Sequence, residues 1–415
     1  MQRNIQNKKK TINDPVLGFN SLQSDLLFDL MEHPYFQRLR RIKQLGLSCM
    51  VYPGANHTRF EHALGATFLM QSAVASLRDK GVDITDEESE AVKTAILLHD
   101  IGHGPFSHAL EYAIVDNLVH EDVSMLLMEK LNEEFHGRLS LAIAIFKNKY
   151  HKRFLHQLVS SQLDVDRLDY LRRDSFYSGV AEGTISADRI IKMMNVQHNE
   201  LVIEEKAIYS IEKFLISRRL MYWQVYLHKT VLSAEITLEK VLKRAKEIAM
   251  SGGEVFATPS LKLFLTQRIS LQHFLPNEKA SERHLLDEFM RIDDNDVIAS
   301  IKEWQHHDDY VLSYLSKSII NRQLYKVKMQ SNAFDVNWTA QLKEKIKKKH
   351  RVNENELDYF LIEREFTNKA YISKDDSISI LTKDGEVKEL SRASDISLGN
   401  LSEVVRKHIL CHASY

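Results

Sequence analysis

The amino-acid sequence predicts a mainly α-helical fold with a small C-terminal α+β lobe, and three observations support this. The 415 residues include only 6 Pro and 14 Gly, so few positions interrupt a helix. Between Ser21 and about Met329, apolar residues recur at helical spacing. Beyond Ala333 the pattern changes to short segments in which apolar and polar residues alternate, as they do in β-strands.

The elements can be taken in chain order. Amphipathic helices are expected at 26–33 and 62–77, separated by a turn at Pro53-Gly54. A long continuous helix is expected over 211–250 and ends at the glycines of MSGGEV. In the C-terminal lobe, Asp384-Gly385 occupies the place of a two-residue hairpin turn.

Composition excludes some classes of protein. The 56 basic and 57 acidic residues nearly cancel, which gives no global charge for coating nucleic acid or a membrane surface. The basic runs 147–153 and 343–351 are expected on solvated faces, so nucleic-acid binding is an alternative that is not favoured. Cys49 and Cys411 match no metal spacing, the start has no signal-peptide core, and no apolar run reaches ~18 residues. We expect a cytoplasmic protein that does not enter membranes.

The strongest chemical signal is a histidine-aspartate pair at the end of an apolar helix. His99 and Asp100 follow AVKTAILL, so the last helical turn would place both in the interior, where a buried carboxylate needs a partner. His62 and Asp166 stand in two other apolar helices. Together the four form a ligand set for one divalent metal, and Fe, Mn, Zn, Ni and Mg all suit nitrogen and oxygen ligands.

Further titratable residues surround this set. His103, His108 and Glu111 follow in HDIGHGPFSHALE, and NLVHEDVS adds His120 and Glu121. Carboxylates near imidazoles in sequence can orient or protonate them, which is the equipment of a general acid. Each residue alone has a structural alternative, such as a helix cap for His120 or a loop hydrogen bond for His108, and a single His or Asp within a helix is more often a satisfied core group.

In these motifs the chain resembles the HD-domain phosphohydrolases, and most closely the dNTP triphosphohydrolases, the sterile-alpha-motif and HD-domain dNTPase and its bacterial dGTPase-like relatives. The likeness extends from about Lys10 to Met329 and is carried by TINDPVLG, HPYFQRLRRIKQLG, VYPGANHTRFEHALG, LLHDIGHGPFSH, HED, LDVDRLDYLRRD and RRLMYWQVYLHK. The resemblance implies an HD-domain fold over 46–250. It also implies an N-terminal segment, 1–45, with regulatory or oligomer contacts, and leaves 251–415 as a C-terminal helical and α+β lobe.

The resemblance also assigns roles to residues. It makes His62, His99, Asp100 and Asp166 the metal ligands. The family's catalytic positions fall on His103, His108, Glu111, His120 and Glu121, with His108 or His120 as the proton donor; many relatives have Asp where this chain has Glu111. The substrate-contact positions fall on Gln44, Arg59, Arg167, Tyr170, Asp174, Arg218 and Tyr226.

These substrate positions suit a deoxynucleoside triphosphate. The three arginines offer guanidinium groups for phosphate oxygens. Asp166, Tyr170 and Asp174 follow one helical stripe, so Tyr170 could pack against the deoxyribose and Asp174 could accept its 3′-hydroxyl. Tyr226 could stack on the base, although ordinary core packing is the simpler explanation of either tyrosine taken alone.

The expected reaction is hydrolysis of a dNTP to a deoxynucleoside and tripolyphosphate, with dGTP as the first substrate to test. Water activated at the metal would attack the α-phosphorus while an imidazolium protonates the departing 5′-oxygen. One alternative is an HD phosphohydrolase acting on another phosphoester, such as a cyclic dinucleotide or an alarmone, but the GYP signature of the cyclic-dinucleotide branch is absent. Another is a catalytically silent nucleotide sensor or single-strand nucleic-acid binder.

The resemblance further implies a second, activating nucleotide site between subunits of a homo-oligomer, a dimer or tetramer. Surface salt bridges are the structural alternative for its residues, which share polar or charged side chains. They are Lys10, Thr11, Asn13, Glu32, Gln37, Arg40, Arg189, Lys206, His228, Lys229, Arg322 and Lys326.

Overall fold

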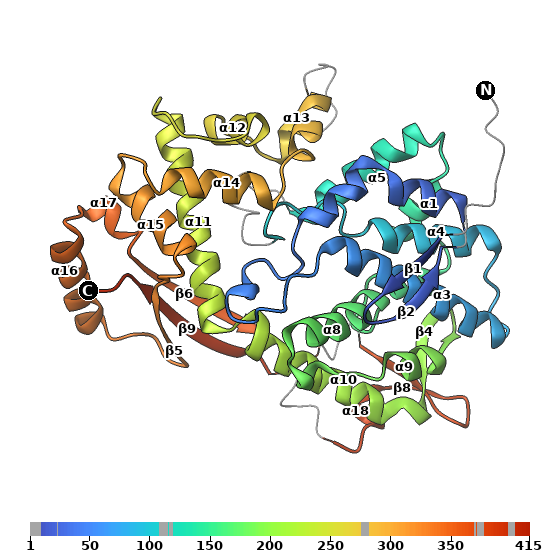
Figure 1. Ribbon diagram of the computed structural model, residues 1–415. Helices are drawn as coiled ribbons and strands as arrows, with labels where there is room; N and C mark the ends of the chain where they lie inside the picture. The colour runs from blue at the N-terminus through green and yellow to red at the C-terminus, as the bar shows by residue number, and fades with distance from the viewer. Residues whose placement is uncertain are drawn as a thin grey trace.

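The computed structural model is mainly helical with three small sheets, as the sequence predicts (Figure 1). It describes residues 10–22, 24–107, 115, 119–274, 282–368, 371, 377–396 and 403–415. The helices up to residue 221 are α1 (Asp25–Glu32), α2 (Pro34–Gln37), α3 (Arg59–Asp79), α4 (Asp86–Leu98), α5 (His120–Glu134), α6 (Ser140–Phe146), α7 (Arg153–Val159), α8 (Val165–Ser178), α9 (Ala187–Met193) and α10 (Ile208–Met221). The later helices are α11 (Lys229–Met250), α12 (Pro259–Thr266), α13 (Glu282–Phe289), α14 (Asp294–Trp304), α15 (Tyr310–Ile320), α16 (Val336–His350), α17 (Glu354–Leu357) and α18 (Leu390–Ala393).

Helices α3 and α4 pass between two hydrophobic cores. In α3, Leu64 and Phe68 belong to the core shared with the C-terminal helices, whereas Met70 and Val74 belong to the core shared with α7 to α10. A helix buried on several faces needs apolar residues around its whole circumference, which explains the nearly continuous apolar sequence. His62 in α3 and Thr94 in α4 are among the polar side chains that these cores bury completely.

The predicted continuous helix over 211–250 is wrong. The chain forms α10, then a π-helical turn at Tyr222–Tyr226, and only then α11. His228 adopts an extended backbone, and its Nδ1 accepts a hydrogen bond from the Thr230 amide at 3.2 Å, which caps α11. The π-helical turn places Tyr222 and Tyr226 in the wall of a cavity that residues of α8 also line.

The strands lie in three sheets. Sheet one is the hairpin β1 (Thr11–Asp14) and β2 (Gly18–Ser21), which the sequence pattern did not predict. The second has the order β3-β4-β7-β8, formed by β3 (Met194–Gln197), β4 (Glu200–Glu204), β7 (Ser379–Leu381) and β8 (Val387–Glu389). The third has the order β5-β9-β6, formed by β5 (Lys326–Gln330), β6 (Leu361–Asn368) and β9 (Val405–His412).

The C-terminal part of the chain packs in two places. Strands β5, β6 and β9 lie beside α11, while β7 and β8 extend the hairpin β3-β4, with Ile203 opposite Ile380 in a parallel pairing (Figure 1). The hairpin expected at Asp384-Gly385 is present, but residues 382–386 form a five-residue connection between Leu381 and Val387 rather than a two-residue turn. Gly385 supplies the left-handed backbone at φ 83° that this connection requires.

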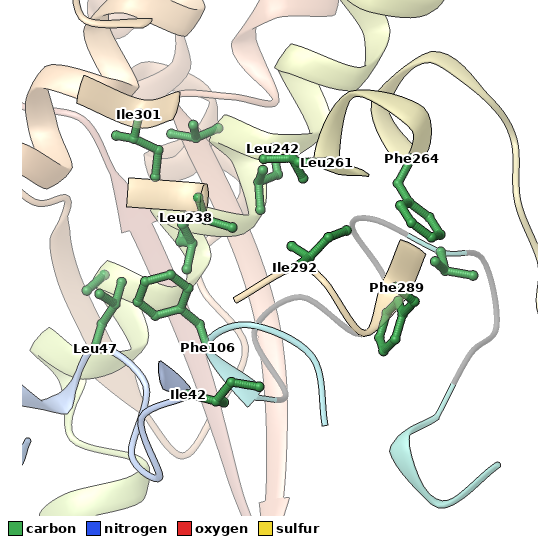
Figure 2. Packing of buried hydrophobic residues seen from close by; sticks show 14 of the residues in the cluster. Ile42, Leu47, Phe106, Leu238, Leu242, Leu261, Phe264, Phe289, Ile292 and Ile301 are labelled. Atoms are coloured by element: carbon green, nitrogen blue, oxygen red, sulfur yellow. The ribbon is translucent and has the colours of Figure 1, made fainter. Parts of the chain in front are cut away.

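Helix α11 packs against α12, α15 and β5 (Figure 1), and it shares the larger core with Phe106 of the loop that follows α4. Figure 2 shows Leu47, Phe106 and Leu238 gathered in one part of the larger core, so that loop, the chain after α2 and α11 share their apolar contacts. The start of α14 holds the same loop, because the Asp294 carboxylate accepts hydrogen bonds from the Phe106 amide at 2.7 Å and the Lys43 amide at 2.9 Å. These contacts fix the position of the loop 101–107.

Candidate active site

Four polar side chains from α3, α4 and α8 meet between the two cores. His62 and Asp166 belong to α3 and α8. His99 and Asp100 were predicted in the last helical turn, but α4 ends at Leu98, so His99 is its C-cap and Asp100 follows. Asp166 Oδ1 lies 3.0 Å from His62 Nε2 and 3.5 Å from His99 Nε2. Asp100 lies 3.8 Å from His62 Nε2 through Oδ2 and 3.4 Å from His99 Nε2 through Oδ1. The predicted metal ligands are therefore brought together.

The geometry of this cluster fits a divalent cation. Ligand atoms bound at about 2.1 Å to one ion lie about 3 Å from each other, which is the spacing seen here. The donor atoms of His62, His99 and Asp166 all lie within 4.8 Å of one another. His62 Nε2 and His99 Nε2 are buried and have no hydrogen-bond partner among the described residues. Buried nitrogen atoms that face carboxylates without hydrogen bonds are suited to share an ion.

Second contacts orient both imidazoles. His62 Nδ1 lies 2.9 Å from Asp169 Oδ2, and His99 Nδ1 lies 2.6 Å from the Ile96 carbonyl oxygen. Asp169 is itself held by Arg173, whose Nε and Nη2 donate to the two carboxylate oxygens at 2.8 and 2.9 Å. Such partners turn the remaining ring nitrogen toward the shared centre. Both Nε2 atoms are thereby fixed in the direction of Asp100 and Asp166.

The charges of the cluster shift its pKa values. Burial opposes a charge on His62, but the contacts with Asp166 and Asp169 outweigh burial and raise the pKa of His62 to about 10. Asp100 and Asp166 likewise outweigh burial and raise the pKa of His99. Burial alone would raise the pKa of Asp166, but the two imidazoles hold it far below its usual value. Protons and a cation would thus compete for the same carboxylates.

A second cluster adjoins the first through Asp100. His103 Nε2 lies 3.3 Å from Asp100 Oδ1, and the rings of His103 and His120 stack with their centroids 3.7 Å apart. Glu121 Oε2 lies 3.3 Å from His120 Nδ1, and its side chain is 62% exposed. Burial, followed by the charge of Arg59, lowers the pKa of His103 well below its usual value. His108 and Glu111 lie outside the described residues.

A cavity of about 430 Å³ opens from these clusters. One side of its wall carries Arg59, Asp100, His103, His120 and Asp166. Further along, the wall is formed by Gln44, Leu45, Gly46, Ser48, Phe106, Ser107, Tyr170, Asp174, Tyr222, Tyr226, Leu227, Leu232, Glu235 and Phe366. Five of the seven predicted substrate-contact residues, Gln44, Arg59, Tyr170, Asp174 and Tyr226, therefore line the same cavity as the predicted metal ligands Asp100 and Asp166.

Asp174, a predicted sugar-contact residue, is the centre of a hydrogen-bonded group. The Tyr226 hydroxyl donates to Asp174 Oδ2 at 2.8 Å, and His57 Nε2 lies 2.8 Å from Asp174 Oδ1. Tyr170 lies between the metal ligands and this group, with ring centroids 6.4 Å from His62 and 6.2 Å from Tyr226. Because Asp174 is only 1% exposed, its two partners hold it in one orientation in the cavity wall.

The other two predicted phosphate-binding residues are not part of the cavity wall. Arg167 forms an ion pair with Asp164 within its own helix. Arg218 stands in the last turn of α10. Burial raises the pKa of Tyr170, and the charges of Arg218 and Arg167 partly oppose that increase, which places both guanidinium groups in the electrostatic neighbourhood of the cavity. Arg59 differs from both, because it lines the cavity and forms an ion pair with Asp100.

The residues predicted for a second nucleotide site fall in three places. Around the first hairpin and α1, Lys10 Nζ lies 3.1 Å from Glu32 Oε1 and the Arg40 guanidinium lies 3.5 Å from the centroid of the Phe60 ring. Arg189 on α9 donates to the Lys206 carbonyl at 2.8 Å. Thr11, Asn13 and Gln37 also lie in this first place, around the hairpin and α1. The third place is near the start of α11 and β5, and it holds His228, Lys229, Arg322 and Lys326.

Sequence reasoning missed several residues of the site. Asp169 and Arg173 hold His62, and His57 holds Asp174, yet the pattern drew attention only to the ligands. The spacing of Asp169 and Arg173, one helical turn apart, is a signal that could have been used. Glu235 and Phe366 carry no such signal, because α11 and β6 bring them to the cavity from distant parts of the chain.

Comparison with known proteins identifies the family. Residues 59–174 match the HD domain, and residues 185–261 match the HD associated region. An uncharacterised protein, YwfO, from Bacillus subtilis is 32% identical over 409 residues, which cover 94% of this chain and 88% of that protein. The chain belongs to the HD-domain phosphohydrolases. His62, His99, Asp100 and Asp166 all lie within the part of the chain that matches the HD domain.

Two further relatives extend the comparison. The solved structure of a phosphohydrolase from Bacteroides thetaiotaomicron is 51% identical, with a TM-score of 0.94 over 98% of this chain and 100% of that one. The deoxynucleoside triphosphate triphosphohydrolase SAMHD1 homologue of Dictyostelium discoideum is 30% identical over 259 residues, covering 57% of this chain and 50% of that protein. Among the described residues of this HD-domain phosphohydrolase, no helix is long and apolar enough to cross a membrane.

Proposed function

We propose that this HD-domain phosphohydrolase is a metal-dependent dNTP triphosphohydrolase, which converts a dNTP and water to a deoxynucleoside and tripolyphosphate. The single observation that carries the proposal is the continuous cavity of about 430 Å³, which joins Asp100 and Asp166 to an aromatic wall. Its volume lies in the range of about 300–1,000 Å³ that is typical of small-molecule sites. The similarity to the Dictyostelium SAMHD1 homologue supports the choice of substrate.

His62, His99, Asp100 and Asp166 would hold the cation, which when bound supplies a Lewis acid for a phosphoryl oxygen and lowers the pKa of water. Arg59 lies beside Asp100 and lines the same cavity, so its guanidinium group suits the phosphates of the substrate. His120 stacks on His103 beside Asp100, where an imidazolium can protonate the departing 5′-oxygen. Positioning and proton transfer are thus assigned to residues of the chain itself.

The sugar would lie between the metal ligands and the aromatic wall. Tyr170 is positioned to pack on the deoxyribose, because it separates His62 from Tyr226. Asp174 is held by His57 and Tyr226 and can accept a hydrogen bond from the 3′-hydroxyl. A 2′-hydroxyl would crowd the Tyr170 ring, so we propose that deoxyribonucleotides are preferred to ribonucleotides.

The test is to follow the products of each dNTP with the manganese-loaded protein. We expect tripolyphosphate and the deoxynucleoside as the first products. Asp166→Ala should abolish turnover and leave folding intact, because two imidazoles lose their shared carboxylate. Asp79→Asn, at the exposed end of α3, is the matched control and should retain activity. Orthophosphate as the first product would refute attack at the α-phosphorus, whereas pyrophosphate together with a deoxynucleoside monophosphate would refute departure of the 5′-oxygen.

We also propose that a second nucleotide activates the enzyme and promotes a dimer or tetramer. The support is the polar group around the first hairpin and α1, where Lys10 pairs with Glu32 and Gln37 accepts from Arg40 at 2.8 Å. Turnover of one dNTP should rise when a second nucleotide is added, and light scattering should detect a larger particle. Hyperbolic kinetics that no second nucleotide alters, at constant mass, would contradict activation.

A further inference from the structure

One carboxylate in the cavity wall takes no part in the site described above. Glu235 belongs to α11 and lines the cavity together with Leu232, Tyr222, Tyr226 and Phe366. Within the described ranges, no hydrogen bond or ion pair engages its carboxylate, and burial alone raises the pKa of Glu235 to about 7. Glu235 is half-buried, and a carboxylate without a partner in the wall of a ligand cavity suits a hydrogen-bond donor from the ligand.

The backbone opposite Glu235 leaves room for such a ligand. Gly46 has a φ of 49°, and a Cβ at this position would lie 3.7 Å from Glu235 Oε1 and 3.3 Å from the Phe106 carbonyl oxygen. The missing side chain therefore keeps the space beside the carboxylate open. Gly46 follows Gln44 by two residues, so this space adjoins the predicted sugar-contact residues of the same cavity.

Strand β6 contributes an aromatic ring to the same cavity wall as the carboxylate. Arg364 Nη2 lies 2.6 Å from Glu239 Oε1, an ion pair that holds β6 against α11. Residues two apart in a strand share a face, so Phe366 lies on the same face as Arg364. Glu235 lies one helical turn before Glu239, on the same face of α11. This register explains why Phe366 and Glu235 line the cavity together although 131 positions separate them in the sequence.

Resting on the proposed dNTP hydrolysis, we propose that Glu235 and Phe366 select the nucleobase of the substrate. The base stacks on the Phe366 ring, and the Glu235 carboxylate accepts two hydrogen bonds from adjacent donors on its edge. Guanine fits this arrangement, because its N1–H and N2 amino group lie side by side and match the two carboxylate oxygens. The site therefore favours dGTP.

The other bases fit the carboxylate less well. Adenine and cytosine each present one amino donor beside a ring nitrogen that carries a lone pair, and this lone pair faces the second carboxylate oxygen. Thymine presents one imino donor between two carbonyl oxygens, which repel the carboxylate on both sides. An amide in place of the carboxylate offers one donor and one acceptor, so it matches adenine and cytosine instead.

The test measures kcat/KM for dGTP, dATP, dCTP and dTTP separately with the manganese-loaded protein. We expect dGTP to be hydrolysed best by the wild type. Glu235→Gln should lower the ratio of dGTP to dATP by about tenfold or more, the scale of one bidentate base contact. Glu247→Gln, an exposed substitution further along α11, is the matched control and should keep the wild-type ratio. Phe366→Ala should lower kcat/KM for all four substrates, because stacking tolerates every base.

Each outcome separates base selection from the proposed hydrolysis. If the wild type hydrolyses dNTPs and the ratio stays unchanged in both Glu235→Gln and Glu235→Ala, base selection by Glu235 is refuted and the proposed function stands. If the wild type forms no deoxynucleoside from any dNTP, both are refuted. Melting curves check that each variant folds, and Glu235→Ala supplies the comparison if the amide variant does not.

Discussion

Replacing Gly65 by alanine should destabilise the protein and weaken its metal site together. Gly65 lies in α3, one turn after His62, where α8 approaches most closely. A Cβ at this position would lie 2.1 Å from Arg173 Nη2 and 2.1 Å from Asp169 Oδ1, far below contact distance. Both atoms belong to a buried ion pair, so neither can move into solvent. The added methyl must therefore displace α8 or separate the pair that orients His62.

The change in the free energy of unfolding has one stabilising and two destabilising contributions. Alanine gains about 1 kcal/mol over glycine within a helix. Overpacking in a core costs about 1–3 kcal/mol, and breaking a buried pair costs about 3–5 kcal/mol. We therefore expect a net loss of about 3–7 kcal/mol in the free energy of unfolding. Because Asp169 would no longer hold His62 Nδ1, metal affinity should fall about 10–100-fold.

The assay combines thermal melting with metal content after equilibrium dialysis. The matched control is Ala75→Gly on the exposed side of α3, which should lose only the helix-propensity contribution of about 1 kcal/mol. A stabilised Gly65→Ala protein with wild-type metal content would refute the reasoning, because propensity alone would then describe the position.

Two further predictions concern pH and metal. Burial raises the pKa of Glu235 from its ordinary 4.5 to about 7. Between these pH values the folded chain keeps a proton on Glu235 that the unfolded chain releases. The free energy of unfolding therefore falls as pH rises from 4.5 to about 7. Glu235→Gln removes this effect, so its melting temperature relative to the wild type should rise between pH 5 and pH 8, and a constant difference would contradict the assignment. Removing metal with a chelator should lower the melting temperature of the wild type, and manganese should restore it. The melting temperature of His62→Ala should change with neither treatment. Equal changes in both proteins would place the bound ion elsewhere.

Local patterns explain why the ligand set could be predicted. His62 and Asp166 stand out because they lie within helices, and His99 and Asp100 because they directly follow an apolar one; the energetic cost of burying such groups calls for a shared partner. The same reasoning misjudged the segment 211–250, where helical periodicity continues through the sequence but the chain breaks at His228. Apolar spacing reports which face is buried and does not report a change in the direction of the helix.

Contacts between distant segments could not be read in this way. Asp14, from an unpredicted hairpin, pairs with Arg173 at 2.9 Å and so joins the N-terminal segment to the residues behind the metal ligands. Glu235 resembles any polar residue of an amphipathic helix until α11 is packed against β6 and the loop 101–107. The arginines show the same limit, since Arg59 lines the cavity and Arg167 pairs with Asp164 instead.

By itself, the sequence determined the helical class, the family and the four residues proposed as metal ligands, because helical spacing and polar groups in apolar surroundings are properties of short segments. Only the tertiary structure decided how those segments enclose a cavity, which arginine lines it and which carboxylate and ring from α11 and β6 form its wall. The physical reason is that pairing and burial depend on distances in space, and residues as far apart in the chain as Glu235 and Phe366 acquire a distance only when the cores pack.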